Sequence, residues 1–312
     1  MDDIAIVVAH HRLVNVVECR GLTKRYGTAA VVDGLELTVG AGQVFGFVGP
    51  NGAGKTTTLR MLLGLVHPSQ GSMSVNGRLL PDPTGLAQVG AMIEEPSFYS
   101  WMSGRRNLET LARCGAPLST ADAIDRVLEA QGLTAVADHK VKTYSQGMRQ
   151  RLGLAAAMMR SPNLLILDEP TNGMDPAGLR AFRSMVRDLA DDGVTVLLSS
   201  HLLGEVEQVC DEVAVLDRGR VIEHGHPREL MTARAQVHVD VAPNERAVAT
   251  LLLRDWPVRA GDAGELVVDT ADARAVNEQL GRGGVWATRL AVVRPSLEDV
   301  FLALTRDDRG AG

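Results

Sequence analysis

The fold of this chain is decided by the stretch Gly49-Pro50-Asn51-Gly52-Ala53-Gly54-Lys55-Thr56, with Thr57 directly after it. The stretch matches the phosphate-binding pattern G-x-x-x-x-G-K-[ST]. An apolar run, Gln43–Val48, precedes it, and a helical pattern, Lys55–Leu65, follows it. In this context the glycines let backbone N–H groups turn towards phosphate oxygens, and the helix N-terminus adds a positive dipole.

Two side chains of this loop have expected roles. Lys55 should reach the β- and γ-phosphates of ATP, and the hydroxyl of Thr56 should bind Mg²⁺. The residues from 49 to 57 therefore predict a site for ATP with Mg²⁺. The alternative is a glycine-rich turn with an exposed lysine, and the flanking strand and helix argue against it.

A second chemical signal is an apolar strand that ends in two acids, Leu164-Leu-Ile-Leu-Asp168-Glu169. Two carboxylates at the end of a buried strand are costly unless charged partners meet them. In a P-loop nucleotidase the first acid holds Mg²⁺, and the second orients the attacking water or accepts its proton. We therefore expect Asp168 to be a metal ligand and Glu169 to be catalytic. An exposed surface pair of acids is the alternative.

The first half of the chain predicts strands followed by a helical insertion. Short strand-like runs at 14–19 and 35–39 surround a turn-rich segment at 23–28, and a hairpin is expected around Asn76-Gly77. Residues 103–160 lack the alternation of strands and carry helical spacing.

Strands and helices then alternate. The expected strands are 164–167, 194–199 and 213–217, and the expected helices between them are 176–190 and 203–210. This alternation predicts an α/β fold with a mainly parallel sheet.

The pattern changes near residue 231. In the following segment, strands and helices are predicted to alternate. The expected strands are 237–241, 265–269 and 287–293, and the expected helices are 245–254, 271–281 and 296–305. They predict a small α+β module at 231–305. The chain ends, 1–15 and 306–312, are expected to be flexible.

Composition narrows the class of partner and compartment. The formal net charge of −6 and the pI near 5.8 argue against a nucleic-acid partner. The three cysteines form no C-x-x-C pair, which favours a reducing cytosol over a disulfide or zinc scaffold. We expect no signal peptide and no membrane span, so any membrane component would come from another chain.

The order of the motifs resembles that of ABC ATPases over about residues 16–230. It continues from the phosphate loop through Tyr144-Ser145-Gln146-Gly147-Met148 and the Asp168-Glu169 strand to Asn172-Gly-Met-Asp175 and Ser199-Ser-His201. Within that family the chain resembles the drug and antibiotic exporter branch, which pairs with separate ABC-2-type permeases. The stretch Pro295-Ser-Leu-Glu-Asp-Val-Phe301 is similar to a C-terminal extension common in that branch.

The resemblance implies a fold, a location and an assembly. The fold would be a P-loop ABC ATPase domain with a mixed sheet core and a helical subdomain at about 96–160. The chain would hydrolyse ATP as the motor subunit of an exporter of drugs, antibiotics or other hydrophobic compounds. It would attach to the cytoplasmic face of the membrane through the permease, as a head-to-tail homodimer with two ATPs at the interface.

The resemblance also assigns roles to single residues. Tyr26 would stack on adenine, and His201 would contact the γ-phosphate and hold the water and Glu169 in place. Ser145, Gln146 and Gly147 form the signature motif, which would bind the ATP held by the other subunit. Asp175 would lie in the loop that links the two active sites.

Two motifs depart from the family pattern. The usual Leu-Ser-Gly-Gly-Gln signature is replaced by a sequence with Gln146 in place of a glycine. Glu94 stands where the family has a glutamine that touches Mg²⁺. A carboxylate oxygen can still bind Mg²⁺, but it adds negative charge beside the γ-phosphate. The alternative is that Glu94 and Glu95 form a solvated pair at the turn before Pro96.

Two other functions compete with the transporter hypothesis. A soluble ABC ATPase usually carries two cassettes or a long coiled coil, whereas this chain has one phosphate loop and no long heptad run. A drug-sequestering protein would use ATP only to dimerise, which the presence of Asp168, Glu169 and His201 argues against. We interpret His224-Gly-His226 as a solvated loop, and leave open whether Tyr99 and Trp101 face a permease or pack partly in the core.

Overall fold

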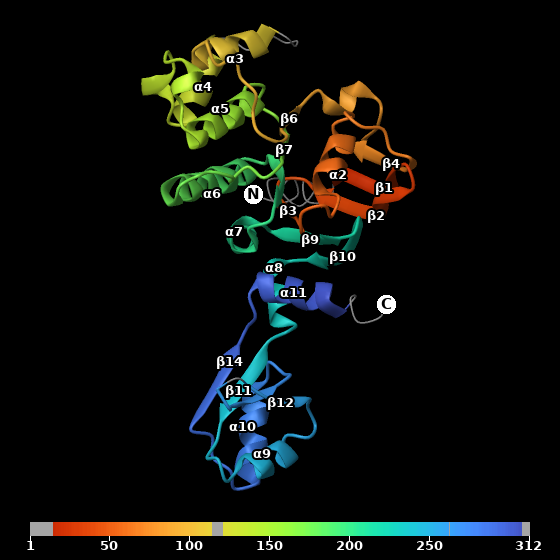
Figure 1. The fold of residues 1–312 in the computed structure, drawn as a ribbon, viewed down its shortest axis with the longest axis vertical. Coiled ribbons are helices and arrows are strands. Elements are labelled where there is room, and N and C mark those ends of the chain that lie inside the picture. Colours follow the sequence, from red (N-terminus) through yellow and green to blue (C-terminus); the bar gives the residue numbers. More distant parts are fainter. Residues whose placement is uncertain (1–14, 114–120, 262, 308–312) are drawn as a thin grey trace, which may run out of the picture. The chain divides into compact units, whose positions relative to one another are not determined.

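The computed structural model describes residues 15–113, 121–261 and 263–307 (Figure 1). Contacts divide the chain into two compact units, Met1–His224 and Gly225–Gly312, so the division falls a few residues before the expected boundary at 230. Most of the ends expected to be flexible lie outside the described residues. Asn15, however, begins a strand, and residues 306 and 307 belong to the last helix.

The first unit contains a six-stranded sheet with the order β10-β9-β3-β8-β7-β6. Its strands are β3 (Val44–Val48), β6 (Val89–Met92), β7 (Leu164–Leu167), β8 (Thr195–Ser200), β9 (Glu212–Asp217) and β10 (Arg220–Gly225). The pairs β3/β8, β3/β9, β7/β8 and β6/β7 are parallel, which confirms the prediction of a mainly parallel sheet. The strands β6 and β10 were not predicted.

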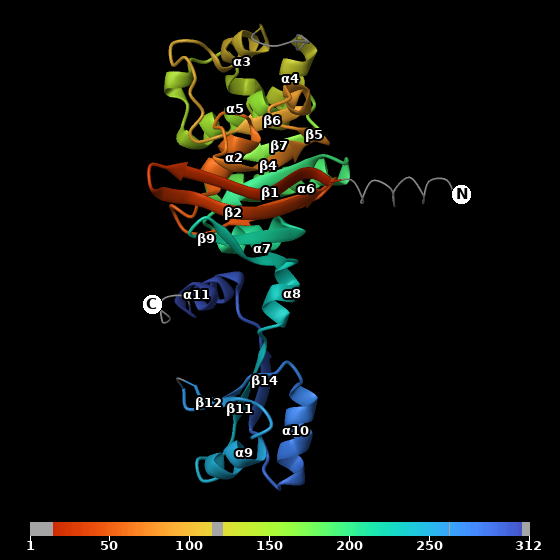
Figure 2. The same ribbon diagram turned by 90° about the vertical axis from the view of Figure 1, so that its right-hand side faces the viewer.

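A four-stranded antiparallel sheet, with the order β2-β1-β4-β5, accompanies it. Its strands are β1 (Asn15–Tyr26), β2 (Ala29–Gly40), β4 (Gln70–Val75) and β5 (Arg78–Leu79), and Figure 2 shows the long β1 and β2 side by side. The predicted turn at Asn76-Gly77 is confirmed, since both residues have positive φ.

The turn-rich reading of residues 23–28 was wrong. Strand β1 continues through this region to Tyr26, because Leu22 is paired with Leu35 on β2 and Thr23 with Gln70 on β4. Register shifts along β1 absorb the irregular sequence, so only residues 27 and 28 remain for the turn.

Helix α2 (Lys55–Leu62) is fixed by the core that the two sheets share. Its Leu59, Met61 and Leu62 are fully buried together with Phe45 and Phe47 of β3. The helix is shorter than the predicted 55–65. Because α2 cannot shift without disturbing this core, its N-terminus is held at the carboxyl end of β3.

The predicted helical insertion is present as α3 (Gly104–Arg113), α4 (Ala121–Ala130) and α5 (Gln146–Met158), with short 3-10 turns at Thr134–Val136 and Val141–Thr143 between α4 and α5 (Figure 1). A further 3-10 turn, Pro83–Leu86, lies before β6. Leu108, Leu128 and Leu152 join the three helices in a core of their own. The helices α6 (Pro176–Asp191) and α7 (Leu203–Val209) connect strands of the parallel sheet.

The second unit is an antiparallel sheet, β12-β13-β11-β14, with four helices. Its elements are α8 (Pro227–Thr232), β11 (Gln236–Asp240), α9 (Arg246–Leu252), β12 (Val258–Ala260), β13 (Leu266–Val268), α10 (Ala273–Arg282), β14 (Arg289–Val293) and α11 (Leu297–Asp307). Buried Val237, Val239 and Leu280 belong to its core. The short β12 and α8 were missed because neither carries a clear periodic pattern.

Across the described parts of both units, no helix combines the length and the apolarity that a membrane crossing requires.

Close packing between β6 and α5 makes Gly90 sensitive to substitution. A Cβ at this position would lie 2.2 Å from the carbonyl oxygen of Ala157, a backbone atom that cannot rotate away. We expect Gly90→Ala to lower the free energy of unfolding by about 1–3 kcal/mol. In α7 a Cβ on Gly204 would meet nothing within 4 Å, so Gly204→Ala should leave stability equal or higher. Urea unfolding followed by circular dichroism measures the free energy of unfolding of both variants. If Gly90→Ala were as stable as Gly204→Ala, the expectation would be contradicted.

Candidate functional site

The loop between β3 and α2 places the N-terminus of α2 at the carboxyl ends of the parallel strands. Gly54 is the cap of α2 and has φ of 103°. A Cβ there would lie 2.5 Å from the carbonyl oxygen of Val31, so both the backbone angle and the space require glycine. The sequence pattern that predicted the loop therefore reflects close backbone packing as well as phosphate binding.

Lys55 is buried at the start of α2, with a relative exposure of 6%. Its Nζ donates to the carbonyl oxygens of Gly49 at 2.7 Å and Pro50 at 3.2 Å, and lies 3.8 Å from Oε1 of Glu169. Burial lowers the pKa of Lys55, while Glu169 and Asp168 act in the opposite direction. A phosphate anion bound beside the ammonium group would favour its charged form further.

Asp168 is buried at the end of β7 and is held on both oxygens. Thr56 Oγ1 donates to Oδ2 at 2.7 Å, and Ser199 Oγ donates to Oδ1 at 2.5 Å. The same serine accepts from the backbone N–H of Glu169 at 3.0 Å. Because β3, β7 and β8 are parallel neighbours, their carboxyl ends bring Thr56, Asp168 and Ser199 together.

Glu169 lies between Lys55 and His201. Its Oε2 is 2.6 Å from Nδ1 of His201 and accepts the backbone N–H of the same histidine at 3.4 Å. The glutamate has φ of 48°, a left-handed conformation that is uncommon for residues with a Cβ and that recurs at functional sites. The structure thus brings Lys55, Glu169 and His201 into one cluster.

A cavity of about 480 Å³ opens beside this cluster. It is lined by Thr56, Glu94, Glu95, Gln146, Gln150, Asp168, Glu169, Asn172 and Gly173. The three expected metal ligands, Thr56, Asp168 and Glu94, therefore share one cavity. The carboxylate of Glu94 is engaged by Arg60 of α2, whose Nη2 lies 2.5 Å from Oε1. No group of three or more His, Cys, Asp or Glu side chains arranged to hold a metal is found among the described residues.

The signature residues lie at the start of α5. Ser145 is the N-cap, and its Oγ accepts the backbone N–H of Met148 at 3.2 Å. Gln146 donates through Nε2 to Oε1 of Glu95 at 3.3 Å. The N-terminus of α5 is therefore a second place where backbone N–H groups and a hydroxyl meet at a helix end.

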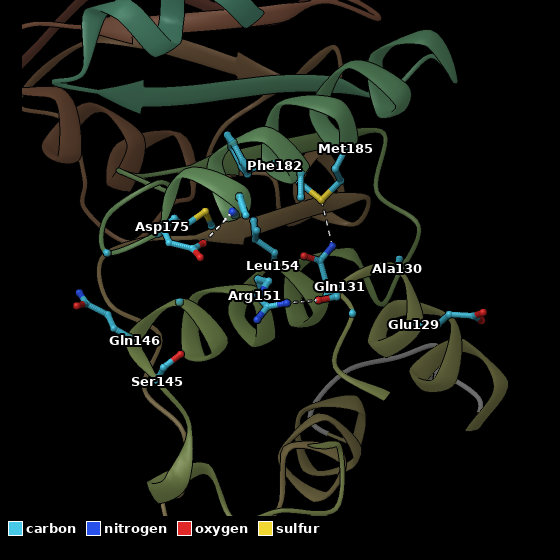
Figure 3. A pocket seen from close by; sticks show the side chains of 17 residues that line it. Glu129, Ala130, Gln131, Ser145, Gln146, Arg151, Leu154, Asp175, Phe182 and Met185 are labelled. Carbon is cyan, nitrogen blue, oxygen red and sulfur yellow. Dashed lines mark hydrogen bonds between the residues drawn. The ribbon is translucent and has the colours of Figure 1, made fainter. Parts of the chain in front are cut away.

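Asp175 and the signature share a second, larger cavity. Asp175 caps α6 by accepting the backbone N–H of Gly178 at 2.9 Å. The cavity measures about 780 Å³, and Figure 3 shows Ser145, Gln146 and Asp175 at one end of it. The apolar side chains of Phe182 and Met185 lie at the other end.

Tyr26 stands apart from this cluster. It ends β1, its ring is 52% exposed, and the Nζ of Lys24 lies 5.0 Å from the ring centroid. Neither cavity includes it. A flat ligand that stacks on the ring face covered by Lys24 would have to displace that ammonium group.

Two further sequence interpretations can be compared with the structure. The solvated-loop interpretation of the histidine pair was wrong for His224, which belongs to β10 near Glu212, but both histidines are exposed and His226 lies between β10 and α8 as the cap of α8. Tyr99 and Trp101 are 50% and 63% exposed and contact each other, so the core-packing alternative for them was wrong.

Two residues of the site were missed by sequence reasoning. Ser199 was quoted only as part of a motif, although a serine at the end of a buried strand beside the Asp168 strand is a usable signal. Arg60 gave no signal beyond its position one helical turn after Thr56, because its partner is distant in sequence.

Comparison with known proteins agrees with this geometry. Residues 32–172 match the family model described as ABC transporter. The chain is 36% identical over 302 residues to the bacitracin transport ATP-binding protein BcrA of Enterococcus faecalis, covering 93% of this chain and 96% of that protein. It is 38% identical over 302 residues to the daunorubicin resistance ATP-binding protein DrrA3 of Streptomyces coeruleorubidus, covering 93% and 95%.

A solved structure described as an ATP-binding subunit of an ABC transporter has the same fold. The TM-score is 0.63 at 28% identity, and the match covers 69% of this chain and 91% of the other. Identity above one third along nearly the whole length of two relatives establishes the family. The chain therefore belongs to the ABC transporter family, in which it is an ATP-binding, ATP-hydrolysing subunit.

Proposed function

We propose that the chain hydrolyses Mg²⁺-ATP as a head-to-tail homodimer and thereby drives the export of a drug, an antibiotic or another hydrophobic compound. The membrane path is a separate ABC-2-type permease, to which the dimer attaches at the cytoplasmic face. One observation supports this proposal above the others. Four side chains lie together at the carboxyl ends of three parallel strands: Lys55, Asp168, Glu169 and His201.

The phosphate loop holds the triphosphate in this proposal. Residues 49–57 surround the phosphates with backbone N–H groups, and the N-terminus of α2 faces them. Lys55 exchanges its present acceptors, the carbonyl oxygens of Gly49 and Pro50, for the β- and γ-phosphate oxygens. The exchange replaces two neutral acceptors with charged ones, which are stronger partners for an ammonium group.

The residues present fit a magnesium ion. Thr56 and Asp168 offer a hydroxyl and a carboxylate already within 2.7 Å of each other, and oxygen donors are the ligands Mg²⁺ prefers. Bound Mg²⁺ would neutralise charge that develops on the phosphate oxygens. Glu94 lines the same cavity and is a further candidate ligand, on the condition that it leaves Arg60.

Glu169 and His201 act on the attacking water. The water oxygen bonds to the γ-phosphorus as the bond to the leaving ADP oxygen breaks, and Glu169 orients the water or takes its proton. The carboxylate of Glu169 is held on one side by His201 and on the other side by Lys55. This arrangement favours turnover over a protein that only sequesters its ligand, since such a protein has no use for a positioned base.

The second anion site supports the dimer. One chain carries one phosphate loop and a separate helix N-terminus at Ser145, Gln146 and Gly147. Two copies related by a two-fold axis would place the signature of each against the ATP of the other, with Asp175 between the two sites. Bound ATP then joins the subunits, and hydrolysis releases them. Tyr26 would stack on the adenine.

The proposed export direction and permease type are supported by the relatives and by the resemblance of residues 295–301 to the C-terminal extension of the exporter branch. Bacitracin and daunorubicin are chemically different, so the printed names of these relatives support a drug or antibiotic as substrate without choosing one. The exposed Tyr99 and Trp101 offer apolar surface for a permease contact. Affinity capture of the chain from membranes of its source tests this, and recovery without a multispanning partner would contradict it.

The hydrolytic role predicts a clean separation of binding from turnover. Glu169→Gln keeps the shape of the side chain but removes the charge that orients the water, so phosphate release should fall at least about a hundredfold. ATP binding should persist, and the variant should accumulate as an ATP-bound dimer. Phosphate release and light scattering test this. Retained turnover, or a variant that stays monomeric with saturating ATP, would oppose it.

The shared pocket predicts complementation between two inactive variants. Lys55→Ala removes the ammonium group that binds the phosphates, and Gly147→Asp introduces a negative charge at the signature motif. The aspartate should not disturb α5, since a Cβ on Gly147 meets its nearest neighbour at an ordinary 3.5 Å and acids are favoured in a first helical turn.

A mixed dimer of these variants contains one pocket with both halves intact. Half of the dimers in an equal mixture are mixed, so ATPase activity should recover to about a quarter of the wild-type value if the sites act independently. Each variant alone should be nearly inactive. Full activity of Gly147→Asp alone, or no recovery in the mixture, would show that the pocket is not shared between subunits.

A further inference from the structure

Arg60 is the positive group nearest to the carboxylate of Glu94. Its Nη2 lies 2.5 Å from Oε1 of Glu94, and it stands on α2 four residues after Thr56, on the same helix face. Thr56 and Glu94 line the same cavity as Asp168 and Glu169. The ion pair therefore lies at the wall of the proposed ATP site.

The balance of charge in this cavity is unfavourable for an anion. Four carboxylates line it, those of Glu94, Glu95, Asp168 and Glu169. Glu169 has Lys55 and His201 beside it, and Asp168 accepts two hydroxyl hydrogen bonds. An ATP molecule brings several more negative charges, so an uncompensated Glu94 would oppose its binding.

Glu94 has an unusual backbone conformation where it pairs with Arg60. Glu94 has φ of 61°, a left-handed conformation. Its neighbour Glu95 accepts a hydrogen bond from Gln146 instead, so the two acids have partners on different elements, α2 and α5. The acidic turn is thus held by two side chains, Arg60 and Gln146. Of its two acids, Glu94 has a positively charged partner, whereas the partner of Glu95 is a neutral amide.

We infer that Arg60 is a positioning residue, which neutralises Glu94 and, in the absence of Mg²⁺, holds its carboxylate away from the bound phosphates. The inference rests on the proposed function, because it needs ATP in this cavity. It also explains how the chain uses a glutamate at this position: the additional charge is compensated by a residue one helical turn beyond the phosphate loop.

The pair contributes little to the fold, so its effect can be separated from stability. The side chains of Arg60 and Glu94 are 37% and 60% exposed, and solvated ion pairs add little to the stability of a protein. Variants of Arg60 and Glu94 should therefore unfold at nearly the wild-type temperature. A change in ligand affinity without a change in unfolding temperature isolates the charge.

Binding of a fluorescent ATP analogue to the full chain, in EDTA, tests the inference without relying on turnover. Arg60→Ala should weaken binding about three- to tenfold, because Glu94 is left as an unpaired charge beside the phosphates. Glu94→Gln should bind as well as or better than the wild type. The double variant should match Glu94→Gln within about twofold, and Arg60→Lys, which keeps the charge, should restore most of the loss.

The controls separate the possible failures. Arg126→Ala removes an exposed arginine from α4 and should leave binding unchanged. If the wild type does not bind, or Lys55→Ala binds as well as the wild type, the proposed function itself fails. If Lys55→Ala loses binding but Arg60→Ala does not, the inference alone fails. It also fails if the double variant is as weak as Arg60→Ala, since Arg60 would then act independently of Glu94.

Discussion

The burial of Lys55 beside two carboxylates is the constraint on which the rest of the structure depends. A buried ammonium group is tolerated only where partners surround it, and here they are two backbone carbonyls of the loop and the carboxylate of Glu169. This requires β3 and β7 to be parallel neighbours of β8, so that their carboxyl ends meet. The apolar core around α2 holds that geometry in place.

Most of the site could be predicted because its signals are local. The phosphate loop follows a strand and begins a helix within a few residues, so the pattern around Gly54 and Lys55 carries its own structural context. Asp168 and Glu169 are equally local, since they end an apolar run. The family resemblance added His201, and the structure places it 2.6 Å from Glu169.

The parts that were missed depend on contacts between distant residues. The strand character of residues 23–26 comes from pairing with β2 and β4, which no local pattern encodes. The pairing of Arg60 with Glu94 joins residues 34 positions apart, and the hydrogen bond of Ser199 to Asp168 joins residues 31 apart. Sequence periodicity shows which face of an element is buried but not which partner it meets.

The two departures from the family pattern are compensated by their neighbours. Gln146 replaces a glycine, and its amide lies against Gly173, where a Cβ would come within 2.4 Å of it. Gly173 has φ of 74°, so the loop that leads to Asp175 turns in a way that leaves room for the larger side chain. The same amide donates to Glu95, and it belongs to the walls of both cavities. Gln146 therefore links the signature of a subunit to the acidic turn beside that subunit's own phosphate loop, as Arg60 links that turn to α2.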